Sequence, residues 1–185
     1  VRMSDGPHGV RVQTEGGDNG VTGSEPATCF PTAATTASSW NPDNVHKMGQ
    51  AIGEEAGYYG VDVVLGPAVN IKRNPLGGRC FEYFSEDPYL AGKMGTAETL
   101  GIQEKGVGVS VKHFALNNQE KYRFVASSEI DERTMREIYL TPFEMALKIG
   151  SDDVQSVKLC VNDNEYEGKG GDHNQSKPSV HQQGY

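Results

Sequence analysis

The stretch that most constrains the fold of this chain runs from Val107 to Arg123 and reads VGVSVKHFALNNQEKYR. It begins with valine at alternate positions, a β-branched pattern that predicts a strand. The strand runs directly into Lys112 and His113, and a polar run follows at once. In parallel α/β folds, chemistry gathers where strands end and the following loops begin. The stretch therefore predicts a ligand-binding or catalytic site at a strand end. The alternative, with about equal weight, is a strand end that is simply exposed to solvent.

The residue types at this strand end indicate what such a site would bind. Lys112 has three rotatable hydrogen-bond donors, and the ring of His113 offers one donor and one acceptor. Together they suit a ligand that is covered with hydroxyl groups.

Helical and strand patterns alternate along the chain, which predicts the α/β fold class. Asn41-Pro42 and Asp87-Pro88 each place a capping residue before a proline, which predicts two helix starts. Pro142 lies inside a third helical pattern and predicts a kink near Ile138. The expected elements are helices over Pro42–Tyr59, Pro88–Glu104 and Glu132–Ile149, strands over Val61–Leu65 and Val107–Lys112, an extended segment over Phe124–Ile130, and one more strand within Val154–Val161.

Near the amino terminus, Asp5 stands directly before a turn. Gly6, Pro7 and Gly9 force the chain to reverse there. A carboxylate held at such a turn can accept two hydrogen bonds from a ligand. The alternative, which is the commoner role, is an aspartate that bonds only the amides of its own turn.

A long loop, Gly66–Asp87, contains the other candidate. Loops longer than about 12–15 residues in a compact domain are usually functional or disordered, and the aromatic residues of this loop favour packing. Arg79 follows two glycines, and its guanidinium can bind a carboxylate or a diol. The alternative is a structural ion pair with Glu82 or Glu86. The two glycines lack the lysine and the strand–helix context of a phosphate-binding loop.

Composition excludes several functions. The 185 residues carry a formal net charge of −8 with no basic run, which argues against nucleic acid. No apolar run approaches the length of a membrane span. The three cysteines are widely spaced and predict neither a disulfide framework nor a metal site, so we expect no metal and no cofactor. No signal segment is seen, which favours the cytoplasm, while the start at Val1 rather than Met leaves the compartment open.

The character of the sequence changes after Gly150. Residues 151–185 are rich in polar residues and glycine, and Gly168–Tyr185 is expected to be disordered and to pack against nothing. We therefore expect one domain over residues 1–150, followed by a degenerate or foreign tail.

Several long motifs resemble one known family, in that family's order. They are MSDGPHGVR, PATCFPTAATTASSW, VDVVLGPAVNIKRNPLGGRCFEYFSEDPYLAG, VKHFALNNQE and IDERTMREIYLTPFE. The chain resembles the amino-terminal domain of glycoside hydrolase family 3, which includes β-glucosidases and related exo-acting enzymes. The resemblance implies a (β/α)₈ TIM-type barrel with the sugar bound at the carboxyl ends of its strands. Because a full barrel needs about 250 residues, this chain would form about half of one.

The resemblance also implies roles for individual residues. Asp5, Arg79, Lys112 and His113 would bind the hydroxyl groups of one sugar ring, with Arg73 as a neighbour. We therefore predict that the first four converge on one pocket at the carboxyl ends of parallel strands. The implied partner is a carbohydrate, a β-glucoside or a similar sugar.

The catalytic carboxylates of the family are missing from this sequence. Its nucleophile is an aspartate in a motif resembling SDW, after an SYN-type strand that Val154–Glu167 resembles without the Ser-Tyr. Its acid/base commonly comes from a second domain. The expected parent activity is retaining hydrolysis of terminal β-linked sugars. The alternatives are a non-catalytic sugar-binding module and a non-functional truncated product. The sugar, the linkage and the oligomeric state stay open.

Overall fold

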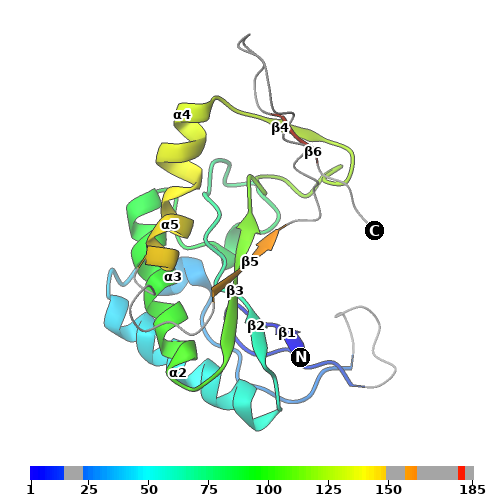
Figure 1. Cartoon of the computed structure of the whole chain (residues 1–185), viewed down its shortest axis with the longest axis vertical. Coiled ribbons are helices and arrows are strands. Elements are labelled where there is room, and N and C mark those ends of the chain that lie inside the picture. The colour runs from blue at the N-terminus through cyan, green and yellow to red at the C-terminus, as the bar shows by residue number, and fades with distance from the viewer. Residues whose placement is uncertain (15–22, 149–156, 162–178, 182–185) are drawn as a thin grey trace.

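The computed structural model describes residues 1–14, 23–148, 157–161 and 179–181, and its centre is a parallel sheet (Figure 1). The strands are β1 (Met3–Asp5), β2 (Val63–Leu65), β3 (Gly108–Phe114) and β5 (Val157–Val161), and they lie in that order. All three neighbouring pairs are parallel. Because the spatial order follows the chain order, each connection leads to the next strand in the sheet.

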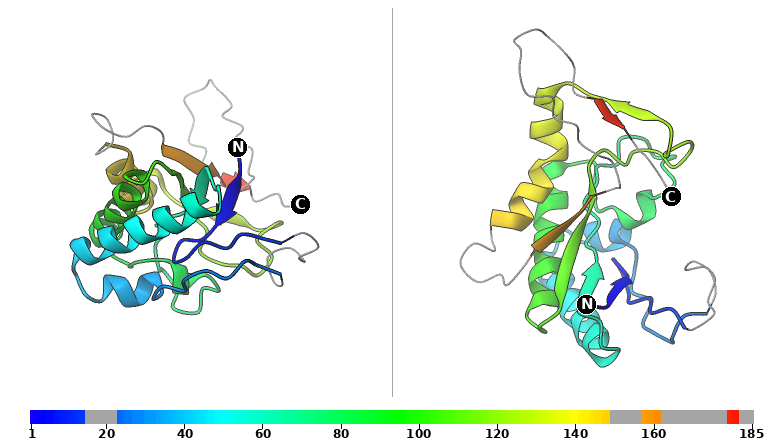
Figure 2. Two further views of the ribbon diagram at one scale, coloured as in Figure 1. Left: turned by 90° about the horizontal axis from the view of Figure 1, so that it is seen from below. Right: turned by 45° about the vertical axis from the view of Figure 1, so that its right-hand side comes forward.

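Helices fill these connections and lie on one side of the sheet (Figure 2). They are α2 (Pro42–Tyr58), α3 (Pro88–Gln103) and α5 (Thr141–Lys148), with the short α1 (Ala33–Ala37) before α2. The two predicted helix starts are confirmed. The side chain of Asn41 accepts a hydrogen bond from the amide of Asp43, and that of Asp87 accepts one from the amide of Leu90. The alternation of strands and helices confirms the predicted α/β class.

Helices α2 and α3 approach each other through glycines. A Cβ atom added to Gly101 would lie 2.2 Å from the carbonyl oxygen of His46, and one added to Gly49 would lie 2.5 Å from that of Glu98. Both contacts are with backbone, which cannot move aside as a side chain would. The absence of a side chain at these two positions therefore lets the helices pack backbone to backbone.

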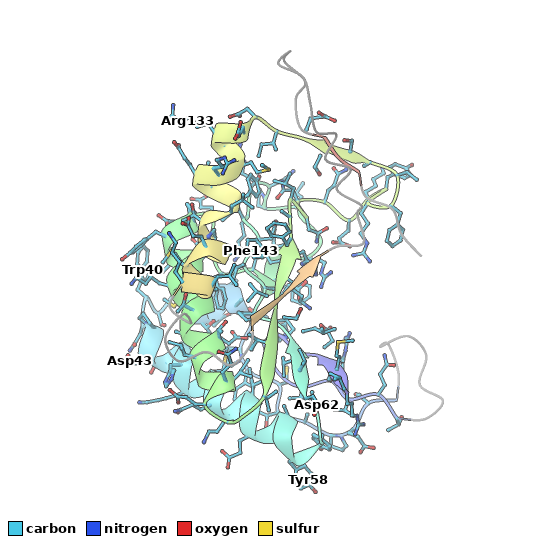
Figure 3. All side chains as sticks on the ribbon, viewed as in Figure 1. Trp40, Asp43, Tyr58, Asp62, Arg133 and Phe143 are labelled. Atoms are coloured by element: carbon cyan, nitrogen blue, oxygen red, sulfur yellow. The ribbon has the colours of Figure 1, made fainter. Side chains whose placement is uncertain are left out.

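The hydrophobic core lies between this helical layer and the sheet. Val64, Val109 and Val111 come from the strands, and Ile52 and Met94 come from the helices, all with at most 1% exposed surface. Phe143 of α5 meets Phe114 at the end of β3 edge to face, with 5.2 Å between ring centroids (Figure 3). The core fixes the strands, and with them the loops that follow their carboxyl ends.

The third predicted helix is present, but it is divided. It consists of α4 (Glu132–Thr134), a π-helical segment, η2 (Met135–Tyr139), and α5. The predicted kink near Ile138 is confirmed by this break, because proline removes an amide donor and its ring crowds the carbonyl four residues earlier. The hydroxyl of Thr141 donates to the Glu137 carbonyl at 2.7 Å, which compensates part of the interrupted ladder.

The tail gives one correction. Residues Ser179–His181 form strand β6, which pairs antiparallel with β4 (Ser127–Glu129). The prediction that Gly168–Tyr185 packs against nothing is therefore wrong for these three residues, because a strand edge with free amides and carbonyls can accept an extended segment of any composition. The other residues of that range lie outside the described part of the chain, as do residues 151–156.

The remaining element bounds agree with the expected ones to within a few residues, which is the usual scatter at element ends. No helix among the described residues is long and apolar enough to cross a membrane.

Candidate functional site

Asp5 ends β1, and the turn after it holds its carboxylate at the carboxyl edge of the sheet. Gly6 makes the turn possible, since its φ is +149° and an added Cβ would lie 2.2 Å from the carbonyl oxygen of Gly9. The Asp5 carboxylate accepts from the Lys112 ammonium at 2.6 Å and from the Arg11 guanidinium at 3.1 Å. The carboxylate thus binds two cations, and the alternative of an aspartate that bonds only its own turn amides is wrong.

The Lys112 ammonium lies between two carboxylates. Its Nζ atom is 2.6 Å from Asp5 Oδ1 and 3.6 Å from Glu82 Oε2. The side chains of Lys112 and Glu82 are 4% and 3% exposed, whereas that of Asp5 is 35% exposed. Burial by itself raises the pKa of Asp5, but the charge and hydrogen bond of Lys112, together with the charges of Arg11 and Arg79, outweigh it and the pKa is lowered. Asp5 is therefore ionised and partly exposed to solvent, and it is paired with the buried Lys112 ammonium.

Arg79 precedes the 3₁₀ turn η1 (Cys80–Glu82) and is tied to it. Its Nε atom donates to Glu82 Oε1, so the predicted alternative of an Arg79–Glu82 ion pair is confirmed. Burial by itself lowers the pKa of Arg79, but the hydrogen bond and the charge of Glu82, together with the nearby Tyr83 and Glu120, raise it. The pair uses one side of the guanidinium, and the group still borders the cavity described below.

His113 follows Lys112 but lies in a different environment. It is 4% exposed, and its Nδ1 atom is 2.9 Å from the hydroxyl of Tyr83. The same hydroxyl accepts a hydrogen bond from the side-chain amide of Asn117 at 2.8 Å. Burial, together with the nearby Arg79 and Lys112 charges, lowers the pKa of His113 to about 2. The ring is therefore neutral at any ordinary pH.

A cavity of about 430 Å³ opens at the carboxyl ends of the strands. Its walls combine charged side chains, one aromatic side chain and the backbone of the turn after Asp5. The lining residues are Asp5, Gly6, Pro7, His8, Gly9, Arg11, Arg79, Phe81, Glu82, Glu120 and Arg123. Such a mixture of fixed donors and acceptors suits a small polar ligand.

The predicted site residues reach this cavity to different degrees. Asp5 and Arg79 line it as expected. Lys112 and His113 are not among the lining residues, although Lys112 contacts Asp5 and Glu82, which are. The reason is burial: the Lys112 ammonium lies beneath the cavity, where it has two carboxylate partners, and His113 packs against Tyr83. That all four converge on one pocket around a ligand stays a prediction.

Arg73 does not line the cavity that holds Asp5 and Arg79. It borders a second cavity of about 530 Å³, together with Asn118 and Tyr139, and it also lines a smaller pocket together with Arg79. Its role in binding a ligand stays a prediction.

Sequence reasoning missed the buried polar residues that support the site. Tyr83 and Asn117 are 2% exposed, and Asn70 is 1% exposed. Asn70 donates to the backbone carbonyl of Asn117 at 3.0 Å and so joins the two loops that follow β2 and β3. The available signal was the polar run that directly follows the strand end at His113.

Three carboxylates and three guanidinium groups line the cavity above a buried ammonium, at the carboxyl ends of parallel strands, and this α/β arrangement suits a hydroxyl-rich ligand. Residues 4–175 match the family described as the glycosyl hydrolase family 3 N-terminal domain. The chain therefore belongs to glycosyl hydrolase family 3, as its motifs predict.

Curated relatives agree with this assignment. The exo-α-(1→6)-L-arabinopyranosidase of Bifidobacterium breve is 54% identical over 148 residues, which cover 79% of this chain and 20% of that protein. The thermostable β-glucosidase B of Acetivibrio thermocellus is 50% identical over 149 residues, with 80% and 20% coverage. The chain spans about a fifth of the length of these relatives.

Solved structures show the same fold. The β-glucosidase 3B of Thermotoga neapolitana in complex with glucose is 44% identical, with a TM-score of 0.74 over 86% of this chain and 22% of that one. The family 3 β-glucosidase of Bifidobacterium adolescentis is 49% identical, with a TM-score of 0.72 and coverage of 87% and 23%.

Proposed function

We propose that this chain forms the sugar-binding half of a glycoside hydrolase family 3 site of the β-glucosidase type. In this proposal β1, β2, β3 and β5 are four consecutive strands of a (β/α)₈ barrel, that is, half of its wall. The parallel pairing in chain order and the helices on one side of the sheet support it. Sugar binds at the carboxyl ends of these strands.

The observation that carries the proposal is the pairing of Asp5 and Arg79 across one cavity. An ionised carboxylate accepts hydrogen bonds from two hydroxyl groups, and a guanidinium donates in a fixed fork. Both groups are held in place, Asp5 by Lys112 and Arg79 by Glu82. A terminal β-linked glucose or a similar sugar fits this chemistry, and the Thermotoga neapolitana relative is described in complex with glucose.

Binding in this site does not amount to hydrolysis. A retaining glycosidase uses two carboxyl groups about 5–5.5 Å apart, one as nucleophile and one as acid/base. The carboxylates at this cavity are already neutralised by cations, Asp5 by Lys112 and Arg11, Glu82 by Arg79, and Glu120 by Arg123. The family's SDW motif does not occur in the 185 residues. We infer that the chain alone positions a sugar ring without attacking it.

The first test is sugar binding by the whole chain. Asp5→Asn keeps the shape of the side chain but removes its charge, and we expect it to weaken glucose binding about tenfold or more, since hydrogen bonds to charged groups contribute about 1.5–3 kcal/mol. The measurement is titration with glucose followed by NMR.

The matched control is Asp43→Asn, because Asp43 is exposed in the first turn of α2 and does not line the cavity. It should bind glucose like the parent chain. Equal affinity of the Asp5→Asn and parent chains would contradict the assignment of Asp5. Absence of glucose binding by the parent chain would favour a non-functional truncated product.

The second test is turnover. We expect the purified chain to release no measurable nitrophenol from the aryl β-glucoside, because the covalent step lacks a nucleophile. Turnover that disappears in Asp5→Asn would overturn this expectation and make Asp5 a catalytic carboxylate. Turnover that survives in Asp5→Asn would reveal a different nucleophile in the chain or a contaminating enzyme.

A further inference from the structure

A chain of hydrogen bonds leads from the cavity wall to His113, and each of its donors and acceptors is determined by the one before. It begins at Glu120, whose carboxylate accepts from Arg123 at 2.8 Å. An ionised carboxylate can only accept. The side-chain atom of Asn117 that lies 2.9 Å from Glu120 Oε1 must therefore be the amide nitrogen, which fixes the orientation of the amide.

The amide orientation of Asn117 fixes the direction of the Tyr83 hydroxyl. The same nitrogen lies 2.8 Å from the Tyr83 oxygen and uses its second hydrogen there. The Tyr83 oxygen is thus an acceptor on that side, and its own proton points elsewhere. Two acceptors are in reach: His113 Nδ1 at 2.9 Å and the Asn117 backbone carbonyl at 3.5 Å. The shorter contact makes His113 Nδ1 the acceptor.

An Nδ1 atom that accepts a hydrogen bond carries no proton. Burial raises the pKa of Tyr83, so its hydroxyl keeps the proton that it donates. The groups that face the His113 ring with charge are the cations Arg79, Lys112 and Arg123, and with burial they keep the ring neutral. A neutral imidazole has one proton, which must then be on Nε2. Among the described residues, no hydrogen bond uses that Nε2 atom.

We propose that Tyr83 and Asn117 are positioning residues that hold His113 as the Nε2–H tautomer, so that its single ring proton can be donated to a ligand oxygen. That the ligand is a sugar rests on the function proposed above. The tautomer itself follows from the hydrogen bonds within the chain. It turns an ambiguous side chain into a fixed donor, whose role does not change between about pH 5 and pH 8.

The test uses the whole chain labelled with ¹⁵N at its five histidines, without sugar. The His113 signal is identified by its absence from His113→Gln. We expect a protonated Nε2 and an unprotonated Nδ1 across about pH 5–8. Tyr83→Phe removes the donor to Nδ1, so both tautomers become populated and both nitrogen shifts move towards average values.

The matched control is Tyr139→Phe, which removes the hydroxyl of another buried tyrosine that accepts from an asparagine amide, here Asn118 at 3.0 Å. It should leave the His113 signals unchanged. A protonated Nδ1 in the parent chain would overturn the proposal, and this outcome can be read even if a variant fails to fold. Unchanged His113 shifts in folded Tyr83→Phe would overturn it as well.

A sugar titration separates this proposal from the proposed function. If Tyr83→Phe leaves the two tautomers equally populated, only half of the molecules present the donor, and glucose affinity falls about twofold. An Nε2–H signal in a chain that binds no glucose would refute the sugar site but leave the tautomer assignment intact.

Discussion

Replacement of Lys112 by methionine is expected to lower the free energy of unfolding by about 3–5 kcal/mol, the usual cost of leaving a buried charge without its partner. Lys112 and Glu82 are 4% and 3% exposed, so water cannot replace the missing ammonium. Methionine keeps most of the side-chain volume, so the loss reports charge rather than a cavity. The measurement is urea unfolding followed by circular dichroism.

The control for this change is Lys105→Met. The Lys105 side chain is 37% exposed, and its nearest carboxylate, Glu54, is 3.9 Å away and 78% exposed. Surface pairs of this kind contribute little, and the control should stay within about 0.5 kcal/mol of the parent chain.

A double replacement tests the physical reason. If the cost of Lys112→Met comes from carboxylates left unpaired, Glu82→Gln removes one of them, and the double variant should lose less stability than the sum of the two single variants. A loss equal to that sum, or a Lys112→Met chain as stable as the parent, would show that the ammonium is not an essential partner of these carboxylates.

Local signals predicted the elements of the fold, because the residues that determine them are close in sequence. Asn41 and Asp87 cap helices through amides two and three residues away. Pro142 interrupts a helix through a carbonyl four residues earlier. The π-helical form of the interruption was not predictable, since it depends on how η2 and α5 pack against α3.

The candidate site could be predicted only in part, for the opposite reason. Asp5 and Lys112 are 107 residues apart in sequence, and Tyr83 and His113 are 30 apart. Periodicity cannot indicate such contacts, and the motifs of the family supplied the first pair. The sequence also could not distinguish a lysine on the pocket surface from one buried beneath it, because that depends on whether carboxylates from two other segments reach its ammonium.

Glu98 is a second residue whose environment could not be predicted from the sequence. It lies on α3 four residues after Met94, on the buried face of the helix, and it is fully buried although it is a glutamate. Neither of its carboxyl oxygens has a hydrogen-bond partner in the described part of the chain. Burial raises its pKa well above the ordinary value, and the Lys112 charge opposes this only in part. A buried acceptor without a donor is a source of instability that no local pattern offsets.

The raised pKa of Glu98 predicts how its contribution to the free energy of unfolding changes with pH. A carboxyl group whose pKa is higher in the folded state than in the unfolded chain contributes stability that is fully present below its unfolded pKa, about 4.3, and is lost as pH rises through the folded pKa. We expect Glu98→Gln, which cannot ionise, to remove this contribution to the slope of unfolding free energy against pH. Glu54→Gln, an exposed change on α2, should keep the slope of the parent chain.

Glu98→Met should go further and stabilise the protein at neutral pH, which is the opposite of what most substitutions in a core do. Methionine fills a similar volume and has no strong acceptor, so it removes two unpaired oxygens without opening a cavity. The expected gain is about 1–3 kcal/mol, the cost of burying an unsatisfied polar group. Urea unfolding of Glu98→Met beside Glu98→Gln separates the two effects, because only methionine removes the polar atoms. A less stable Glu98→Met chain would show that Glu98 has a partner that holds it in place. An unchanged slope of unfolding free energy against pH in Glu98→Gln would show that the pKa of the Glu98 carboxyl group does not differ between the folded and unfolded states.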